Sequence, residues 1–271
     1  MTPDRQAVKK VSREYDAFLE QTSALSSHYG ESNNQKYLLT YRARITSQVA
    51  VRRQIIEEQE LGQGKMLSLG GGQGITLFIL NRLTGIKGTL IDHPALSTGA
   101  MATFYKEQGL ETVAFDFANA ATEPLPVSGT FEMIECCQCI EHWNFSPIPI
   151  FRQVFSERLS PAGSLLVTVP NAASLYRRLA ALAGRNPYPA MQSFIDTDNG
   201  KPGAEVSPHW REYTREDLQM LVAHCGGTCA AVRTASYPPA SHTTLAHRIY
   251  SLLYNLHPRL KENLEAVCTR A

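Results

Sequence analysis

A glycine-rich turn between two apolar segments constrains the fold of this chain more than any other feature. Residues 65–69 form a short apolar run, glycines follow at positions 70, 71, 72 and 74, and an amphipathic stretch begins at Ile75. This order predicts a strand, a tight turn and a helix, with a backbone that can approach a ligand closely. A dinucleotide-binding turn has the pattern Gly-x-Gly-x-x-Gly, and Ile75 stands where its last glycine belongs. The spacing therefore disfavours a nicotinamide-dependent enzyme.

The rest of the chain alternates apolar runs of strand length with longer amphipathic segments. The expected strands are residues 65–69, 88–91, 112–115, 131–136, 164–169, 228–234 and 264–268. The expected helices are residues 73–83, 95–108, 148–158 and 244–256, and a further helix that Thr214 and Asp217 would cap and that Cys225-Gly-Gly227 would end. Such alternation predicts an α/β fold with a parallel sheet covered by helices on both faces. Ligands of this architecture bind beyond the carboxyl ends of the strands, where the glycine turn falls.

Two other segments lie outside this alternation. Residues 1–62 have a polar, helical pattern with a loop at 30–34, and we expect them to form a helical extension of a domain at 63–271. The segment from about 171 to 208 is rich in proline and glycine. A long insertion of this kind is more often a functional lid than an idle loop.

Composition and charge exclude several classes of partner. The 271 residues have a formal net charge of +1 and 43% of them are hydrophobic, so nothing indicates binding to nucleic acid or to a membrane surface. The arginines at 42, 44, 52 and 53 are interleaved with glutamates and fit a solvated helix face. The polar first ten residues and the absence of long apolar runs favour a cytoplasmic chain. Its six cysteines fit reduced thiols.

Two aspartates follow expected strands at positions that suit a nucleoside. Asp92 comes about 20 residues after the glycine turn, and its carboxylate can accept hydrogen bonds from ribose hydroxyls. An aspartate before Pro94 also suits a helix N-cap. Asp116, followed by Phe117, can accept a hydrogen bond from an adenine amino group, or serve as a plain turn residue. The residues alone leave these alternatives open.

Further short motifs follow in order: Pro-Leu-Pro at 124–126, Glu-His at 141–142, Leu-Ser-Pro-Ala-Gly at 159–163 and His-Trp-Arg-Glu-Tyr-Thr at 209–214. With the spacing Gly70-x-Gly72-x-Gly74, they make the chain resemble class I S-adenosylmethionine-dependent methyltransferases. It is most similar to the bacterial group of ubiquinone-type, glycan-cluster and natural-product enzymes, from about residue 35 to the end. The resemblance implies a Rossmann-like sheet of seven strands, the last antiparallel, with N-terminal helices and an inserted lid.

The resemblance also implies which residues surround the methyl donor, S-adenosylmethionine. These are Ser68, Gly70, Gly71, Gly72, Gly74, Asp92, His93, Asp116, Phe117, Cys136 and Cys137. The glycines would line the methionine and ribose, Asp92 would hold the ribose, and the two cysteines would face the cofactor beside its methyl group. Ser68 stands where the family usually has an acid, so we expect weaker cofactor binding rather than its loss.

A hydroxyl acceptor also needs a proton acceptor near its transfer path. His142, after the fourth strand, is the leading candidate, with a structural histidine as the alternative. His209 and Tyr213, after the expected lid, are second candidates. Ubiquinone-type enzymes hold a metal through Glu-x-x-Glu-His, but the first position is Gln138 here, and an amide is a poorer ligand for a hard cation. We therefore expect no metal, and we expect the cysteines to be buried apolar residues rather than zinc ligands.

The sequence thus predicts a methyltransferase that acts on a hydroxyl oxygen of a small-molecule or carbohydrate acceptor. An N- or C-methyltransferase of a natural product, or a protein that binds S-adenosylmethionine without turnover, are the alternatives. The lid and the N-terminal helices set the acceptor, and neither has a transferable code. The oligomeric state is likewise open, with a homodimer as one option.

Overall fold

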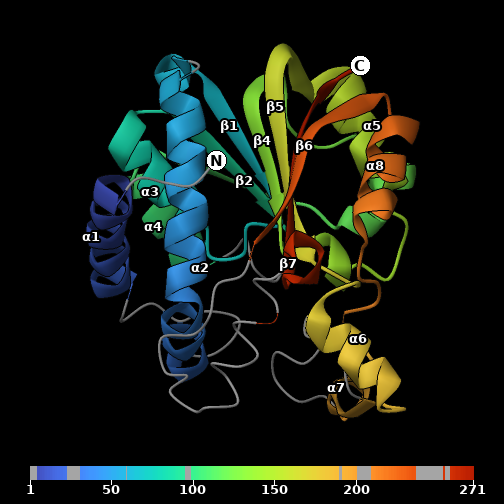
Figure 1. Cartoon of the computed structure of the whole chain (residues 1–271). Helices are drawn as coiled ribbons and strands as arrows, with labels where there is room; N and C mark the ends of the chain where they lie inside the picture. Colours follow the sequence, from blue (N-terminus) through green and yellow to red (C-terminus); the bar gives the residue numbers. More distant parts are fainter. Residues whose placement is uncertain are drawn as a thin grey trace. The chain divides into compact units, whose positions relative to one another are not determined.

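The computed structural model describes residues 5–22, 31–58, 60–94, 99–188, 191–199, 209–235, 253 and 257–271. Its strands form a seven-stranded sheet in the order β3-β2-β1-β4-β5-β7-β6 (Figure 1). They are β1 (Lys65–Leu69), β2 (Lys87–Asp92), β3 (Glu111–Ala114), β4 (Phe131–Cys137), β5 (Leu159–Pro170), β6 (Gly227–Ala235) and β7 (Asn263–Arg270). The expected Rossmann-like α/β fold is confirmed.

The direction of the strands also agrees with the sequence. β1 pairs with β2 and β2 pairs with β3 in parallel, as strands linked by helices must. β7 runs antiparallel to both β5 and β6. The antiparallel final strand that the resemblance implied is therefore confirmed.

The helices are α1 (Arg5–Thr22), α2 (Glu31–Glu58), α3 (Ile75–Thr84), α4 (Ala100–Glu107), α5 (Ile148–Gln153), α6 (Leu175–Leu182), α7 (Met191–Asp198) and α8 (Arg215–His224). The expected loop at 30–34 needs correction, because α2 begins at Glu31 and residues 31–34 are helical. Serine and asparagine suit helix starts as well as loops, so composition alone misplaces this boundary. Residues 95–98, and most of the expected helix at 244–256, lie outside the described residues.

Contacts divide the chain into two compact units, residues 1–135 with 157–163 and residues 136–156 with 164–271. In the first unit, α1, α2 and α3 contact one another (Figure 1). The rings of Phe18 on α1 and Phe78 on α3 have centroids 5.2 Å apart, and the ring of Phe104 on α4 lies 5.7 Å from that of Phe78. The apolar side of the N-terminal extension is therefore buried inside this unit.

In the second unit, α8 packs on β6 and β7. The helix begins with a capping box, in which Thr214 accepts from the backbone N–H of Asp217 and Asp217 accepts from that of Thr214. Helices α6 and α7 lie in the segment expected to form a lid, whose residues 200–208 are outside the described part of the chain. Among the described helices, none combines the length and apolarity needed to cross a membrane.

Candidate functional site

The glycine turn after β1 has a backbone that favours glycine. Gly70, Gly72 and Gly74 adopt φ values of 64°, 58° and 63°, in the left-handed region that other residues rarely enter. Hydrogen bonds fix the turn at both ends: Gly70 N–H donates to the Ile91 carbonyl, and Gly74 N–H donates to the Gly71 carbonyl, each at 2.9 Å. The turn is therefore tied to β2 and to the start of α3.

The glycines differ in what surrounds them. A Cβ on Gly71 would lie 2.3 Å from Ser68 Oγ, and one on Gly74 would lie 2.9 Å from the hydroxyl of Tyr105. A Cβ on Gly72, in contrast, would meet nothing within 4 Å. Gly71 and Gly74 are thus needed because the turn packs on the side chains beneath it. Gly72 marks the side where the backbone is open to a ligand.

Asp92, at the end of β2, is bound to this turn. Its Oδ2 accepts from the N–H of Gly72 and its Oδ1 from the N–H of His93, both at 2.7 Å. Burial raises the pKa of the Asp92 carboxyl from 3.8 to about 6, although the two backbone hydrogen bonds act in the opposite direction. Asp92 therefore presents a carboxylate beside the open glycine at neutral pH, while the His93 side chain is exposed.

Asp116 and Phe117 follow β3 in a short 3₁₀ turn. Asp116 caps this turn, since its Oδ1 accepts from the N–H of Ala118 at 3.0 Å. The Phe117 side chain is buried, with its ring edge-on to that of Phe115 at 5.9 Å. The turn role that the sequence left open for Asp116 is thus present. A role of either residue at an adenine ring stays a prediction.

Beneath the glycine turn lies a buried polar group that the sequence did not predict. Ser68 Oγ donates to Glu135 Oε1 at 2.9 Å, and Arg52 Nε lies 2.6 Å from Glu135 Oε2. All three side chains are at most 3% exposed. The solvated helix face expected for the arginines of α2 is therefore wrong for Arg52. A signal was present in the sequence, because Glu135 is an acid within the apolar run of β4.

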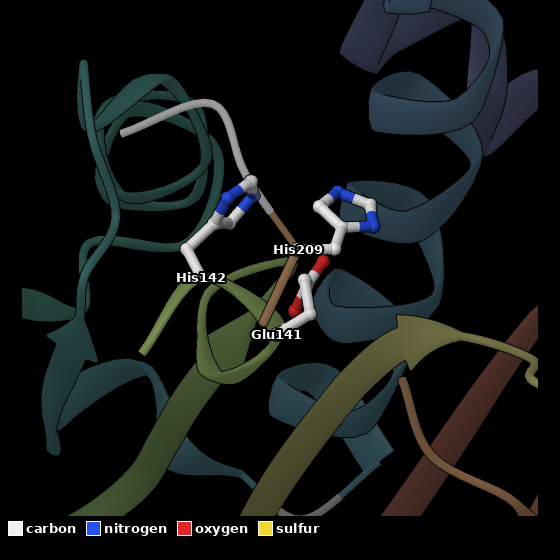
Figure 2. Close-up of side chains that lie close together, drawn as sticks. All are labelled: Glu141, His142 and His209. Atoms are coloured by element: carbon white, nitrogen blue, oxygen red, sulfur yellow. The ribbon is translucent and has the colours of Figure 1, made fainter. Parts of the chain in front are cut away.

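In the second unit, Glu141, His142 and His209 come together (Figure 2). Glu141 and His142 belong to the short 3₁₀ turn Ile140–His142 that follows β4, and His209 precedes α8. The backbone N–H of Trp210 donates to the Glu141 carbonyl at 2.7 Å, which ties the two segments together. The imidazole rings of His142 and His209 stand edge to face, with centroids 4.7 Å apart. The structure thus brings together two of the expected catalytic candidates.

Glu212 orients one of these histidines. His209 Nδ1 lies 3.0 Å from Glu212 Oε1, and the guanidinium of Arg177 on α6 forms an ion pair with the same carboxylate. A carboxylate paired with a guanidinium accepts hydrogen bonds, so Nδ1 of His209 holds the proton. In neutral His209, Nε2 is then the basic nitrogen. Glu212 was within a motif of the sequence, but its type and spacing alone did not indicate this role.

The same three side chains have the chemistry to hold a metal ion. One ligand atom from each of Glu141, His142 and His209 can be chosen so that all lie within 4.8 Å of one another. Two imidazoles and one carboxylate fit a borderline transition metal better than a hard cation such as Mg²⁺. The residues therefore fit such an ion as well as they fit proton transfer, and the expectation of no metal stays a prediction.

The remaining candidates are two cysteines of β4 and Tyr213, which interacts electrostatically with Glu141 and Cys136. Cys136 is fully buried on β4 and Cys137, the last residue of that strand, is half-buried. Tyr213 is buried, and this burial raises the pKa of its phenol to about 12. Among the described residues, no cysteines form a cluster of metal-ligand geometry. Instead Cys229 and Cys268 face each other across β6 and β7, with sulfurs 3.2 Å apart.

A mixed α/β sheet with an open glycine turn after β1, and a carboxylate at the end of β2, is typical of proteins that bind a nucleotide-like ligand. A family model described as a methyltransferase domain matches residues 41–226. The chain therefore belongs to the methyltransferase-domain family. This confirms the expected class I S-adenosylmethionine-dependent methyltransferase, its enzyme class and S-adenosylmethionine as its methyl donor. A search of curated protein sequences found no match.

Two solved structures with similar folds support the same architecture, and a third is similar at a lower score. Magnesium protoporphyrin IX methyltransferase from Synechocystis PCC 6803, with bound S-adenosylhomocysteine, is 10% identical with a TM-score of 0.54 over 86% of each chain. A methyltransferase from Archaeoglobus fulgidus is 13% identical with a TM-score of 0.50, over 87% of this chain and 99% of the other. An O-methyltransferase from neocarzinostatin biosynthesis is 16% identical with a TM-score of 0.46, and the match covers 83% of this chain but only 57% of the other. At these identities the likeness shows the fold alone.

Proposed function

We propose that this methyltransferase acts on a hydroxyl oxygen of a small-molecule or carbohydrate acceptor. The observation that supports this proposal is the His209–Glu212 pair, which fixes one tautomer of His209. Oxygen acceptors need such a base, because a hydroxyl loses its proton as the new bond forms. Amines and activated carbon acceptors depend less on a base at neutral pH, so N- or C-methylation is the alternative.

In this mechanism, bound S-adenosylmethionine supplies an electrophilic methyl group on a sulfonium centre. Asp92 accepts hydrogen bonds from the ribose hydroxyls, and the open backbone at Gly72 lets the donor approach the turn. His209 Nε2 takes the proton of the acceptor hydroxyl, while Glu212 holds the imidazole and stabilises its charged form. His142 lies beside it and can bind the same hydroxyl or take its proton. Tyr213 is a hydrogen-bond donor rather than a base, because its raised pKa keeps the phenol protonated.

Binding and turnover together test this function. Titration calorimetry should show micromolar binding of S-adenosylhomocysteine and no binding of NAD. Release of S-adenosylhomocysteine should then occur with hydroxylated acceptors and not with the amines that match them in shape. Turnover with the amines instead would favour N-methylation. Binding without turnover on any acceptor would favour a protein that holds the cofactor without catalysis.

The pH dependence of cofactor binding tests the role of Asp92. Protonation removes the acceptor that the ribose hydroxyls need, so affinity for S-adenosylhomocysteine should fall about tenfold per pH unit below the Asp92 pKa of about 6. Asp92→Asn should weaken binding by about tenfold or more at neutral pH and flatten the profile. Equal affinities of wild type and Asp92→Ala at neutral pH would refute the ribose role.

The contribution of Asp92 to the stability of the unbound protein should have the opposite pH dependence to the cofactor affinity. The folded-state pKa of Asp92 lies above 3.8, so the folded state binds this proton more tightly than the unfolded chain does. The contribution of Asp92 to stability is therefore most favourable below about pH 4 and declines as the pH rises through about 6. Opposite trends in stability and in cofactor affinity would distinguish a bound ribose from general unfolding.

The location, partners and assembly of the protein are part of the same proposal. The near-neutral charge of the chain supports a protein without nucleic-acid or membrane-surface partners, and we propose a cytoplasmic location. A homodimer is the oligomeric state to test first, by size-exclusion chromatography with light scattering.

A further inference from the structure

The buried polar group beneath the glycine turn joins three elements of the first unit. Arg52 comes from the middle of α2, Ser68 from β1 and Glu135 from β4. Both carboxylate oxygens of Glu135 are occupied, Oε1 by the Ser68 hydroxyl and Oε2 by Arg52 Nε. Such a group is costly to bury, and the ion pair and the Ser68 hydrogen bond offset part of that cost.

The position of this buried polar group links it to the glycine turn. The Ser68 hydroxyl lies against the backbone of Gly71, where a Cβ would come within 2.3 Å. On either side of Gly71, the N–H groups of Gly70 and Gly72 are held by the Ile91 carbonyl and by Asp92. Ser68 thus packs against the glycine turn at Gly71, and β2 holds the same turn through hydrogen bonds. Any shift of the Ser68 hydroxyl must move Gly71 or open a gap under it.

Glu135 determines where that hydroxyl points. A serine hydroxyl can rotate among its staggered positions, and the charged acceptor at 2.9 Å selects one of them. Arg52 in turn holds Glu135 in place with a charge that is equally buried. A carboxylate thus lies one hydrogen bond away from position 68, on β4. Its position is set from α2, a helix of the N-terminal extension.

We propose that Arg52 and Glu135 are positioning residues for the methyl donor, which hold Ser68 under the glycine turn and make α2 part of the donor-binding unit. The inference rests on the proposed use of that turn to bind the donor. Neither residue needs to touch the donor, since both act through Ser68 and Gly71. The N-terminal extension therefore contributes to the affinity of the donor as well as to the fold.

A double-mutant cycle on cofactor affinity tests this inference. Ser68→Ala removes only the hydroxyl and should weaken S-adenosylhomocysteine binding by about fivefold to tenfold. Arg52→Met together with Glu135→Met replaces the ion pair by apolar side chains of similar volume, a change that buried pairs often tolerate. This double variant should fold, yet bind the cofactor as weakly as Ser68→Ala. Adding Ser68→Ala to the double variant should change the affinity no further, because the Ser68 hydroxyl has already lost the Glu135 carboxylate that fixes its direction.

The matched control lies in the second unit. Arg233 on β6 forms an ion pair with the buried side chain of Glu265 on β7. Arg233→Met should leave the cofactor affinity unchanged, whatever its effect on stability. All affinities are measured well below the melting temperature of each variant, so that loss of fold and loss of binding are separate readouts. Wild-type affinity in Ser68→Ala, or in a folded Arg52→Met/Glu135→Met protein, would overturn the inference alone. Failure of the wild type to bind S-adenosylhomocysteine would overturn the proposed function as well.

Discussion

Replacing Arg52 by methionine should lower the free energy of unfolding by about 3–5 kcal/mol, a large part of the stability of a typical domain. The substitution keeps the length and apolar volume of the side chain but removes its charge. The Glu135 carboxylate, which is 3% exposed, then stays buried without the cation that Arg52 supplies. Urea denaturation followed by circular dichroism measures the change.

The neighbouring residue on α2 provides the control. Arg53 pairs with Glu57 one turn later, and the Glu57 side chain is 51% exposed, so Arg53→Met should cost at most about 1 kcal/mol. Arg52→Met/Glu135→Met should recover most of the stability, because no buried charge is left unpaired. Similar losses in the two single-arginine variants would show that the Arg52–Glu135 pair contributes no more than a surface pair.

The features that the sequence predicted well are local ones. A short apolar run closed by glycines determines β1 within a few residues, and the structure places it at Lys65–Leu69 as expected. The capping box at Thr214 likewise predicts the start of α8, because Thr214 and Asp217 satisfy each other's backbone within one turn. Asp92 could be placed because the distance from turn to carboxylate follows from one strand, one helix and one strand.

The features that the sequence missed depend on contacts between residues far apart in the chain. Arg52 lies among other charged residues, and its spacing from the nearby glutamates predicts a solvent-exposed side chain on the helix. Nothing in that spacing indicates an ion pair with a residue of a strand. Only the tertiary structure shows that Glu135 needs a cation and that α2 supplies it. The role of Glu212 was missed for the same reason. The sequence analysis named its neighbours His209 and Tyr213 as candidates, but Arg177, which forms the ion pair with Glu212, lies on α6.

His209→Ala should lower kcat by about 10²–10⁴-fold on a hydroxyl acceptor, while the affinity for S-adenosylhomocysteine stays unchanged. The sequence favoured His142 as the base, but Glu212 contacts His209, and a base held in one tautomer is the better proton acceptor. His142→Ala should therefore have the smaller effect. Steady-state kinetics and titration calorimetry measure the two quantities.

Glu212→Gln tests whether orientation or bulk matters at this position. The amide keeps the size of the side chain but can present its NH₂ to Nδ1, which would favour the opposite tautomer and leave Nε2 protonated. We expect kcat to fall nearly as far as in His209→Ala. Arg177→Met is the matched control for the lost ion pair, since it leaves the carboxylate on His209, and it should reduce stability more than kcat.

A metal ion at the same three side chains would give a different pattern of losses. Glu141→Gln would then reduce activity as much as either histidine variant, because each would remove one ligand. Dialysis against a chelator would abolish turnover, and a transition metal such as Zn²⁺ or Mn²⁺ would restore it. Proton transfer by His209 predicts the reverse: activity survives the chelator, and the kinetic loss is greater in His209→Ala than in Glu141→Gln. Glu141 separates the two mechanisms most sharply because, of the three, it has no part in taking the proton.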